Sequence, residues 1–222
     1  MVGLMLKDFY ESFRIKKNLI GFICSILLYG MVFFLMPSEY IVILLVVLTI
    51  PMTSVSPLQY SIEQDELSKF DQMLLTYPIS KKTIVMTKIL ETYIFSFASF
   101  LLLSLPVVLL AIYGYHIISL QEGLLVLSIS VIFTLIMLPI NNAGFLTFGN
   151  KKGTILYVVT LVAFVIGFIT LNFFVGVEQL LLIPLNRWLL YGSVLAIIIN
   201  ILGYFACLKI YVSTHLTTPC TK

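Results

Sequence analysis

Side chains that could catalyse a reaction or bind a metal are scarce in this sequence, and they do not gather in one place. The two histidines, His116 and His215, are far apart, and none of the long apolar stretches holds two acidic residues. Catalysis needs paired carboxylates, clustered histidines or an activated nucleophile in one place. The spacing of Cys24, Cys207 and Cys220 fits neither a disulfide framework nor a metal site. The sequence therefore predicts no catalytic residue and no metal ligand.

A few polar side chains stand inside the apolar stretches, where they could line a pathway or bond between helices. Glu91 lies at helical spacing from Lys88, which favours a local ion pair over a role in a pathway. The amides are Asn141, Asn142, Asn172 and Asn200. Amides within membrane helices commonly bond to a neighbouring helix, for about 0.6 kcal/mol on average. Helix packing is thus predicted ahead of substrate contact for each of them.

The composition indicates a membrane protein. Hydrophobic residues make up 60% of the 222 residues and charged residues only 10%, whereas soluble domains carry about 25% charged residues. A helix needs about 20 apolar residues to cross the hydrocarbon core of a bilayer. Stretches of that length lie at about 19–36, 40–58, 89–113, 123–148, 154–176 and 188–210. The sequence predicts an all-α polytopic protein with six transmembrane helices in a single domain over residues 1–222.

The basic residues predict how these spans are oriented. Every lysine and arginine except Arg187 falls before the first span, in the second or fourth connection, or at the end of the chain (Lys209 and Lys222). Short loops rich in lysine and arginine stay in the cytoplasm, so both termini are predicted to be cytoplasmic. No basic patch interleaved with aromatic residues stands outside the apolar stretches, so nucleic acid is not expected as a partner.

The N-terminal segment 4–17 has the pattern of an amphipathic helix. Its apolar side chains are Leu6, Phe9, Tyr10 and Phe13. Charged residues alternate with them, so the segment is predicted to lie on the inner leaflet with its cations toward anionic lipid. The alternative is a simple positive-inside anchor without a mechanical role.

The connection 59–88 between the second and third spans is polar. The run 61–64 fits a capping box, and acidic residues follow in the first turn. Apolar side chains then recur at helical spacing, at Leu67, Phe70, Leu74 and Tyr77. This pattern predicts a short amphipathic helix over 62–77, a break at Pro78 and a second helix capped by Ser80. A protein partner in the cytoplasm would cover the apolar stripe, and the alternative is that the stripe lies on the inner leaflet.

The runs 63–70 and 75–88 resemble the loop between the second and third spans of bacterial type-2 ABC exporter permeases. In that family an acidic, aromatic-bearing helix leads to a Leu-Pro-Ile/Val-Ser/Thr-basic turn, and a lysine opens the next span. This sequence has Tyr77 where leucine is usual and Phe70 where tryptophan is frequent, and both residues keep a bulky apolar group. The likeness in topology extends over the whole chain.

The resemblance implies a permease without its own ATPase. In that family two permeases pair, here as a homodimer, and separate nucleotide-binding subunits that hold ATP and magnesium dock on their cytoplasmic helices. The residues expected to meet that partner as a coupling helix are Glu63, Asp65, Glu66, Leu67, Phe70, Leu74, Tyr77 and Pro78. The expected activity is export of a hydrophobic or amphipathic substrate, such as a short peptide, across the bacterial cell membrane. A membrane-embedded enzyme and a passive channel or immunity protein remain as alternatives.

The turn 149–154 is the part of the sequence nearest to a phosphate-binding loop. It lacks the Gly-Lys-Ser/Thr ending of such loops and lies between two predicted spans. It is therefore interpreted as a positive-inside turn, and energy must come from another chain.

Overall fold

The computed structural model describes residues 2–70, 73, 77, 79–174 and 185–214, and within these ranges all regular structure is helical. The all-α prediction is thus confirmed. The elements are α1 (Val2–Arg14), α2 (Lys16–Leu35), α3 (Glu39–Ser68), α5 (Lys81–Ser99), η1 (Phe100–Ser104), α6 (Leu105–Leu109), η2 (Leu110–Gly114), α7 (Leu120–Phe174) and α9 (Leu185–Thr214).

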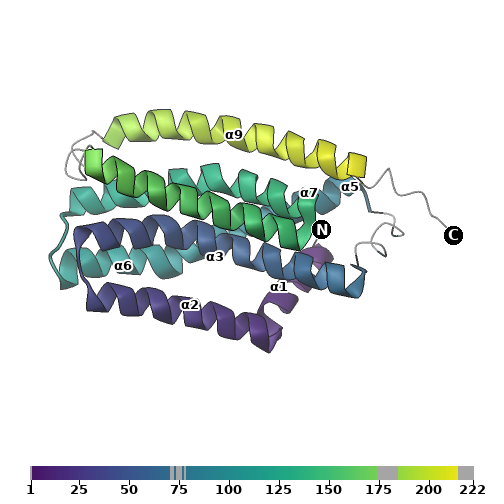
Figure 1. Ribbon diagram of the computed structural model, residues 1–222, viewed down its shortest axis with the longest axis horizontal. Coiled ribbons are helices and arrows are strands. Elements are labelled where there is room, and N and C mark those ends of the chain that lie inside the picture. Colours follow the sequence, from purple (N-terminus) through teal and green to yellow (C-terminus); the bar gives the residue numbers. More distant parts are fainter. Residues whose placement is uncertain (1, 71–72, 74–76, 78, 175–184, 215–222) are drawn as a thin grey trace.

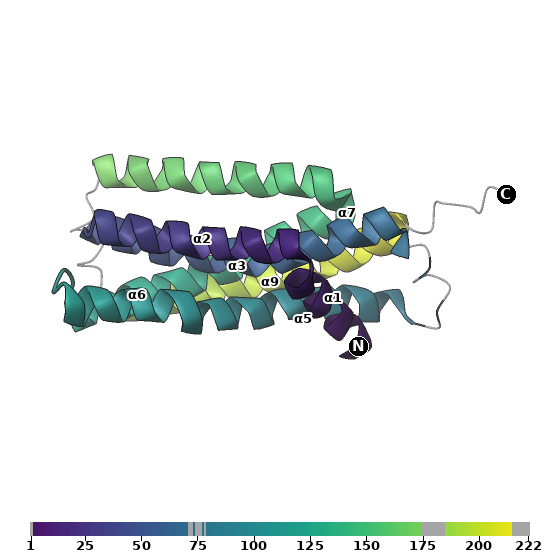
Figure 2. The same cartoon turned by 90° about the horizontal axis from the view of Figure 1, so that it is seen from below.

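The long helices lie side by side in a bundle, and α1 crosses them obliquely (Figures 1 and 2). The helices long and apolar enough to cross a membrane are Lys16–Leu35, Glu39–Ser68, Lys81–Gly114, Leu120–Gly167 and Leu189–Tyr211. The chain is therefore a multi-pass membrane protein. The connections from α2 to α3 and from η2 to α7 lie at one end of the bundle, and α1 and the C-terminal end of α3 lie toward the other (Figure 1).

Helix α7 consists of two helices that meet at a sharp turn. Gly149 has φ 76° and ψ −176°, and the two halves lie next to each other in Figure 1. These halves correspond to the predicted stretches 123–148 and 154–176. Only glycine adopts this backbone conformation readily, because a Cβ atom would collide with the neighbouring carbonyl groups. A Cβ at this position would also lie 2.5 Å from Oε1 of Glu66.

The third predicted span is a composite helix in which π-helical turns flank α6. Pro106 lies in α6, and its ring nitrogen has no hydrogen to donate. Because the regular ladder of hydrogen bonds fails at such a residue, wider turns of the π-helical kind are an expected local response.

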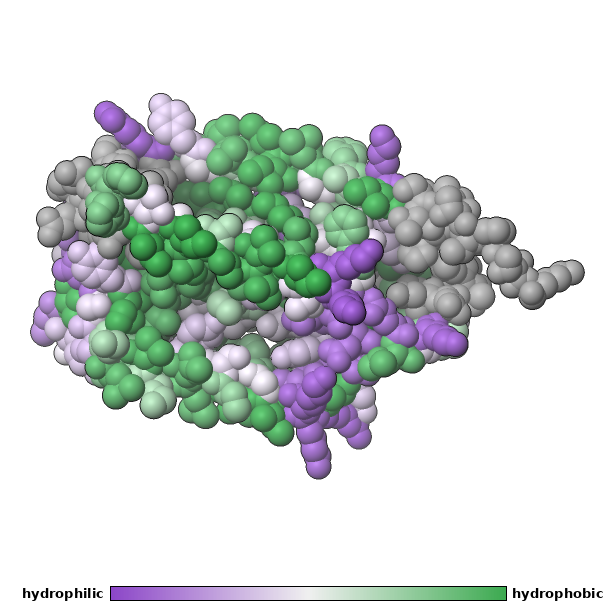
Figure 3. Space-filling view, viewed as in Figure 1, coloured by the Kyte–Doolittle hydropathy of each residue, from purple (hydrophilic) through white to green (hydrophobic). Residues whose placement is uncertain are grey.

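Helix α3 is the centre of the bundle. It is mostly buried, whereas α2 and α9 are mostly exposed. Val42 and Val46 of α3 pack against Phe33 of α2, Val108 of α6 and Val126 of α7. Apolar side chains cover the middle of the face seen in Figure 3, and hydrophilic ones gather toward the end where α1 lies. The outer surfaces of α2 and α9 thus suit contact with lipid.

The predicted separate helix over 62–77 is wrong in its first half. Helix α3 continues from the membrane span without a break to Ser68 and ends at Lys69, which is left-handed with φ 56°. Ser61 is buried in the middle of this helix and accepts a hydrogen bond from Lys88 instead of capping a helix start. The capping-box pattern at 61–64 does not mark a helix start, because α3 is already helical through the residues that precede it. The second predicted cap is confirmed, since the Ser80 hydroxyl accepts from the Thr83 N–H at 3.1 Å and α5 follows.

The turn at Gly149 leads to a first prediction. Gly149→Ala should lower the stability of the protein by about 1–3 kcal/mol, because alanine is strained at this φ and ψ. The matched control is Gly167→Ala, where a Cβ meets nothing within 4 Å and the helix is regular. The thermal unfolding midpoint of each purified variant in detergent is the measurement. Equal midpoints for the two variants would contradict the strained turn.

Candidate functional site

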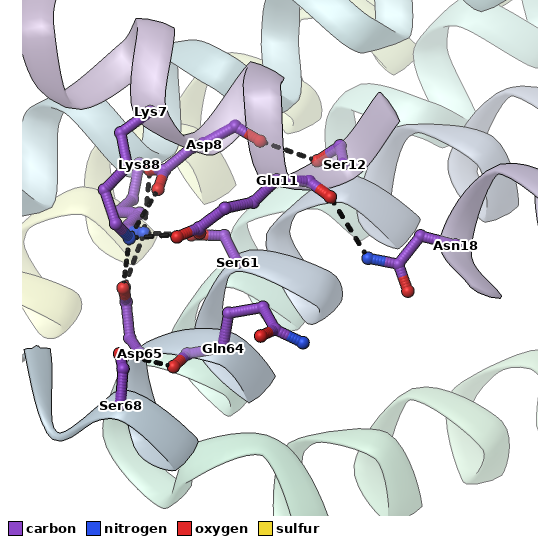
Figure 4. A network of polar contacts seen from close by, with 10 residues as sticks. All are labelled: Lys7, Asp8, Glu11, Ser12, Asn18, Ser61, Gln64, Asp65, Ser68 and Lys88. Atoms are coloured by element: carbon purple, nitrogen blue, oxygen red, sulfur yellow. Dashed lines mark hydrogen bonds and ion pairs between the residues drawn. The ribbon is translucent and has the colours of Figure 1, made fainter. Parts of the chain in front are cut away.

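A cluster of charged side chains joins three helices at one end of the bundle. It contains Lys7, Asp8 and Glu11 from α1, Ser61 and Asp65 from α3, and Lys88 from α5 (Figure 4). We refer to these six residues as the polar junction. It lies close to the end of α3 that the sequence analysis singled out.

The two lysines of the polar junction each bridge different helices. Lys88 Nζ lies 2.7 Å from Asp8 Oδ2 and 2.9 Å from Asp65 Oδ2, and it also donates to the Ser61 hydroxyl. Lys7 Nζ donates to Glu11 Oε2 at 3.0 Å, to Asp8 Oδ1 at 3.3 Å and to Asp65 Oδ1. Asp65 is thus held by both lysines at once. Cations and carboxylates alternate through the cluster, so each charge has an opposite neighbour.

Burial makes this pairing necessary. Asp65 is 2% exposed, Asp8 3% and Lys88 6%. An unpaired charge in such surroundings costs several kcal/mol, whereas a paired and hydrogen-bonded one is tolerated. Removing one of these partners takes from the buried charges next to it a contact that compensates them. The three helix ends are therefore held in one relative position.

The ionisation of the α1 residues follows from the same contacts. Burial by itself would raise the pKa of Asp8, but the charge and hydrogen bond of Lys88 outweigh it, and the pKa is lowered. Burial likewise opposes the charged form of Lys7, but Asp65 outweighs it and the pKa of Lys7 is raised. Both groups thus remain charged near neutral pH. At Glu11 burial prevails over the hydrogen bond from Lys7 and raises the pKa of the carboxyl.

The carboxylates of Asp8, Glu11 and Asp65 lie close enough together to suggest a cation site, with one oxygen of each within 4.8 Å of the others. Lys7 Nζ contacts all three residues. An ammonium group therefore already provides the positive charge that a metal ion would bring.

The end of α3 is also bonded to α7. The Glu66 carboxylate accepts from the backbone N–H of Asn150 at 2.7 Å, directly after the turn at Gly149, and Gln59 Nε2 donates to Thr154 Oγ1 at 3.2 Å. A negative charge is favourable at such a helix start. The last turns of α3 are thus attached to α1, α5 and α7 together.

Comparison with known proteins identifies the family of this bundle. Residues 3–212 match the family model of the ABC-2 family transporter proteins. This chain belongs to the ABC-2 transporter family. No curated protein and no solved structure matches it significantly. The resemblance carried by residues 63–88 is confirmed, and the chain is a membrane component of an ABC transporter, for which the family implies an ABC ATPase partner.

The residues predicted to meet that ATPase differ in their surroundings in this ABC-2 permease. Asp65 is buried in the polar junction and is not free to pair with a second chain. Glu63 pairs with the exposed Lys17 at 3.2 Å, and Glu66 is bonded to the start of the second half of α7. The expectation that all three carboxylates face the partner therefore needs correction. The sequence shows that Glu63, Asp65 and Glu66 are close together in the chain, but it does not show which of their side chains is buried.

The predicted apolar stripe is divided in a similar way. Leu67 is 72% exposed and Tyr77 is also exposed. Phe70 instead packs against the cluster of Ile84 and Val85, and Lys7 Nζ lies 4.2 Å from its ring centroid. Leu74 and Pro78 lie outside the described residues. Among the described residues of the stripe, Leu67 and Tyr77 are therefore the exposed ones.

Glu91 does not form the favoured ion pair with Lys88, because the carboxylates of Asp8 and Asp65 occupy that ammonium group. Its side chain is buried, and Oε1 has no hydrogen-bond partner among the described residues. Helical spacing points only to partners of Lys88 on its own helix, whereas its actual partners, Asp8 and Asp65, come from α1 and α3.

The intramembrane amides of the permease lie between its helices. Asn142 donates to Thr92 Oγ1 at 3.0 Å. Asn200 donates to the Leu135 carbonyl at 2.7 Å and accepts from Tyr93, so it connects three helices. Asn141 is buried, and its Oδ1 has no partner in the described part of the chain. The side chain of Asn172 is outside the described set. For Asn142 and Asn200 these contacts are those of helix packing.

The sequence analysis missed Lys7, Asp8 and Ser61 as members of the site. Lys7 and Asp8 belong to the charged side of the predicted helix 4–17, whose cations were expected to face anionic lipid. A usable signal was present: Lys88 precedes an apolar stretch and needs acidic partners if it is buried.

A cavity of about 260 Å³ adjoins the polar junction. Asp65, Glu66 and Lys88 contribute polar atoms to its wall, and Ile84, Phe145 and other apolar residues form the rest. It lies where α3, α5, α7 and α9 meet, so the end of α3 borders an open space as well as three helices.

The polar junction yields a second prediction. Asp65→Asn should destabilise the permease by about 3 kcal/mol or more, because the buried Lys88 and the half-buried Lys7 lose a shared carboxylate. The matched control is Glu63→Gln, two residues earlier on the same helix, whose partner Lys17 is 78% exposed. Such an exposed pair contributes less than about 1 kcal/mol. Thermal unfolding in detergent measures both, and equal losses would contradict the role assigned to Asp65.

Proposed function

We propose that this chain is the permease subunit of an ATP-driven exporter in a bacterial cell membrane, and that the C-terminal end of α3 receives the movement of a separate ABC ATPase subunit. Membership of the ABC-2 family supports the transport role. The observation that carries the proposal is that the end of α3 combines an exposed apolar residue, Leu67, with bonds to α1, α5 and α7 from the same two turns.

The bonds of these turns define how a displacement would travel. A push on Leu67 moves Asp65, which is paired with Lys7 of α1 and Lys88 of α5. Separating a buried ion pair costs more than moving the helices that carry it, so the three helix ends shift together. Helix α5 continues into a membrane-spanning segment through Gly114, which takes the movement into the bilayer.

The orientation follows from the distribution of basic residues. The connection after α3, the turn after Gly149 and the corner between α1 and α2 all carry exposed lysines, and these include Lys17, Lys82 and Lys152. Short connections rich in lysine remain in the cytoplasm. We therefore propose that the polar junction and both termini lie on the cytoplasmic side, where an ATPase subunit can reach Leu67.

A pair of identical permeases is the proposed transport unit. The space between α3, α6 and α7 is filled by a core that includes Val42, Val46 and Val126. A filled bundle favours a pathway between two copies over one inside a single copy. Helices α2 and α9 both offer long apolar outer surfaces for such a contact.

The cargo suited to this arrangement is hydrophobic or amphipathic, such as a short peptide, because the apolar helices offer few charges. ATP and magnesium belong to the partner subunit. A membrane enzyme fits less well, because the connection from η2 to α7, which contains His116, lies at the opposite end of the bundle from α1 (Figure 1). A passive channel or immunity protein would work without any ATPase.

The docking surface gives a third prediction. Leu67→Asp should reduce co-purification of the ABC ATPase subunit with the permease by about tenfold or more, because an exposed apolar contact residue is replaced by a charge. Leu67 makes no contribution to the buried clusters, so insertion and folding of the permease should be unchanged.

The matched control is Ser68→Asp, which adds the same charge one residue later at an exposed position off the stripe. Binding of the ATPase is quantified from affinity-purified membranes of cells that co-express both subunits. If the Leu67→Asp variant retains the ATPase fully, α3 is not its docking point. If transport proceeds without ATP, the protein is not an ATP-driven exporter.

A further inference from the structure

One buried carboxyl group beside the polar junction has no cation of its own. Glu91 lies in α5, three residues after Lys88, and is 3% exposed. It forms no ion pair with a described residue, and its Oε1 has no hydrogen-bond partner in the described part of the chain. A carboxylate buried without a partner is strongly unfavourable. Glu91 therefore needs either a partner or a neutral form.

The cations of the polar junction are already engaged. Lys88 Nζ is paired with Asp8 at 2.7 Å and with Asp65 at 2.9 Å. Lys7 Nζ contacts the same two residues and Glu11. Within the described residues, two ammonium groups thus face three carboxylates before a fourth acidic group is added. The polar junction has negative charge in excess, so a further carboxylate next to it is not neutralised.

The side chain that Glu91 meets is another acidic one. The charged groups around Glu91 are Asp8 and Lys7 from α1 and Lys88 from α5, and Asp8 is the one placed to share a hydrogen bond with it. Two ionised carboxylates cannot bond to each other, because both only accept. A carboxylate oxygen has more than one lone pair, so Asp8 Oδ2 can accept a hydrogen bond in addition to its contact with Lys88. A hydrogen on one of the two carboxyl groups supplies the missing donor.

The contacts of the two carboxyl groups decide which of them carries the hydrogen. Asp8 has an ammonium group beside each oxygen, with Lys7 Nζ 3.3 Å from Oδ1 and Lys88 Nζ 2.7 Å from Oδ2. Such contacts favour the ionised form of a carboxyl group, whereas burial without them favours the neutral form. Asp8 therefore remains the acceptor, and Glu91 is the donor.

We propose that Glu91 is a proton-binding site, whose carboxyl group holds a proton at neutral pH and donates it in a hydrogen bond to the Asp8 carboxylate. The proton joins α1 to α5 inside the bundle. Its loss leaves two carboxylates next to each other with Lys88 between more acidic groups than it can neutralise, so α1 is then held less tightly against α5. The inference does not depend on the exporter role, because it uses only contacts within this chain.

Infrared spectroscopy of the purified full chain in a maltoside detergent tests the proposal, because a protonated carboxyl group absorbs at a higher frequency than a carboxylate. At neutral pH the parent protein should show a protonated-carboxyl band that is lost in Glu91→Gln. Labelling of the glutamate side chains with ¹³C should shift this band to lower frequency in the parent, and labelling of the aspartate side chains should leave it in place. The labelling result needs no variant, so it holds even where a substitution disturbs folding.

The matched control is Glu39→Gln, which changes an exposed glutamate at the start of α3. This variant should keep the band in full. The thermal unfolding midpoint of Glu91→Gln should stay within about 3 °C of the parent, because glutamine is neutral and its amide can also donate to Asp8. The loss of the band is then due to the carboxyl group and not to unfolding.

Two results overturn the proposal. If Glu91→Gln removes only absorption of an ionised carboxylate, Glu91 is charged in the parent and a cation, such as a sodium ion, compensates it. If the band shifts with labelled aspartate and not with labelled glutamate, the proton resides on an aspartate and Glu91 is not its site.

Discussion

The pairing of Asp65 with Lys88 is the interaction on which the arrangement of this end of the bundle depends. Both groups are buried, and each is tolerated there as a charge because it has opposite charges next to it. Asp65 also engages Lys7, and Lys88 also engages Asp8, so two helix ends and the N-terminal helix meet around these two residues. A helix whose tip is exposed is in this way joined to helices that enter the membrane, which is the mechanical property that an ATP-driven permease requires.

The same interaction determines how α1 contributes to the protein. Because Asp8 and Ser12 face the bundle, the apolar side of α1 faces outward. A single helix therefore presents exposed apolar side chains on one side and contributes to the polar junction, which also holds the end of α3, on another. The turn at Gly149 completes this end of the molecule, because Glu66 accepts from Asn150 at the start of the returning helix. The described contacts thus concentrate where the chain passes between water and lipid, while the middle of the bundle is an apolar core.

Local patterns predicted some features well and others poorly. The cap at Ser80 was predictable because it depends on its own hydroxyl and the N–H three residues later. The cap at Ser61 failed because the preceding residues continue the helix, so the same pattern carries no structural meaning there. The pair of Glu91 with Lys88 failed for another reason: helical spacing brings the two together, but carboxylates from α1 and α3 approach the lysine from other directions. Contacts between distant segments override local ones wherever a buried charge has a choice of partners.

The sequence by itself determined the helical class, the apolar lengths suited to a bilayer and the family, because these depend on composition, on runs of residues and on a motif within one connection. Only the tertiary structure decided which charged residues are buried together, which face of α1 points outward and which part of the stripe on 67–77 remains open. The physical reason is that a charge next to an apolar stretch can face water or be buried with a partner, and the two outcomes are indistinguishable until the partner is located in space. Asp65 and Glu63 lie two residues apart on one helix, yet Asp65 is buried with Lys88 whereas Glu63 pairs with the exposed Lys17.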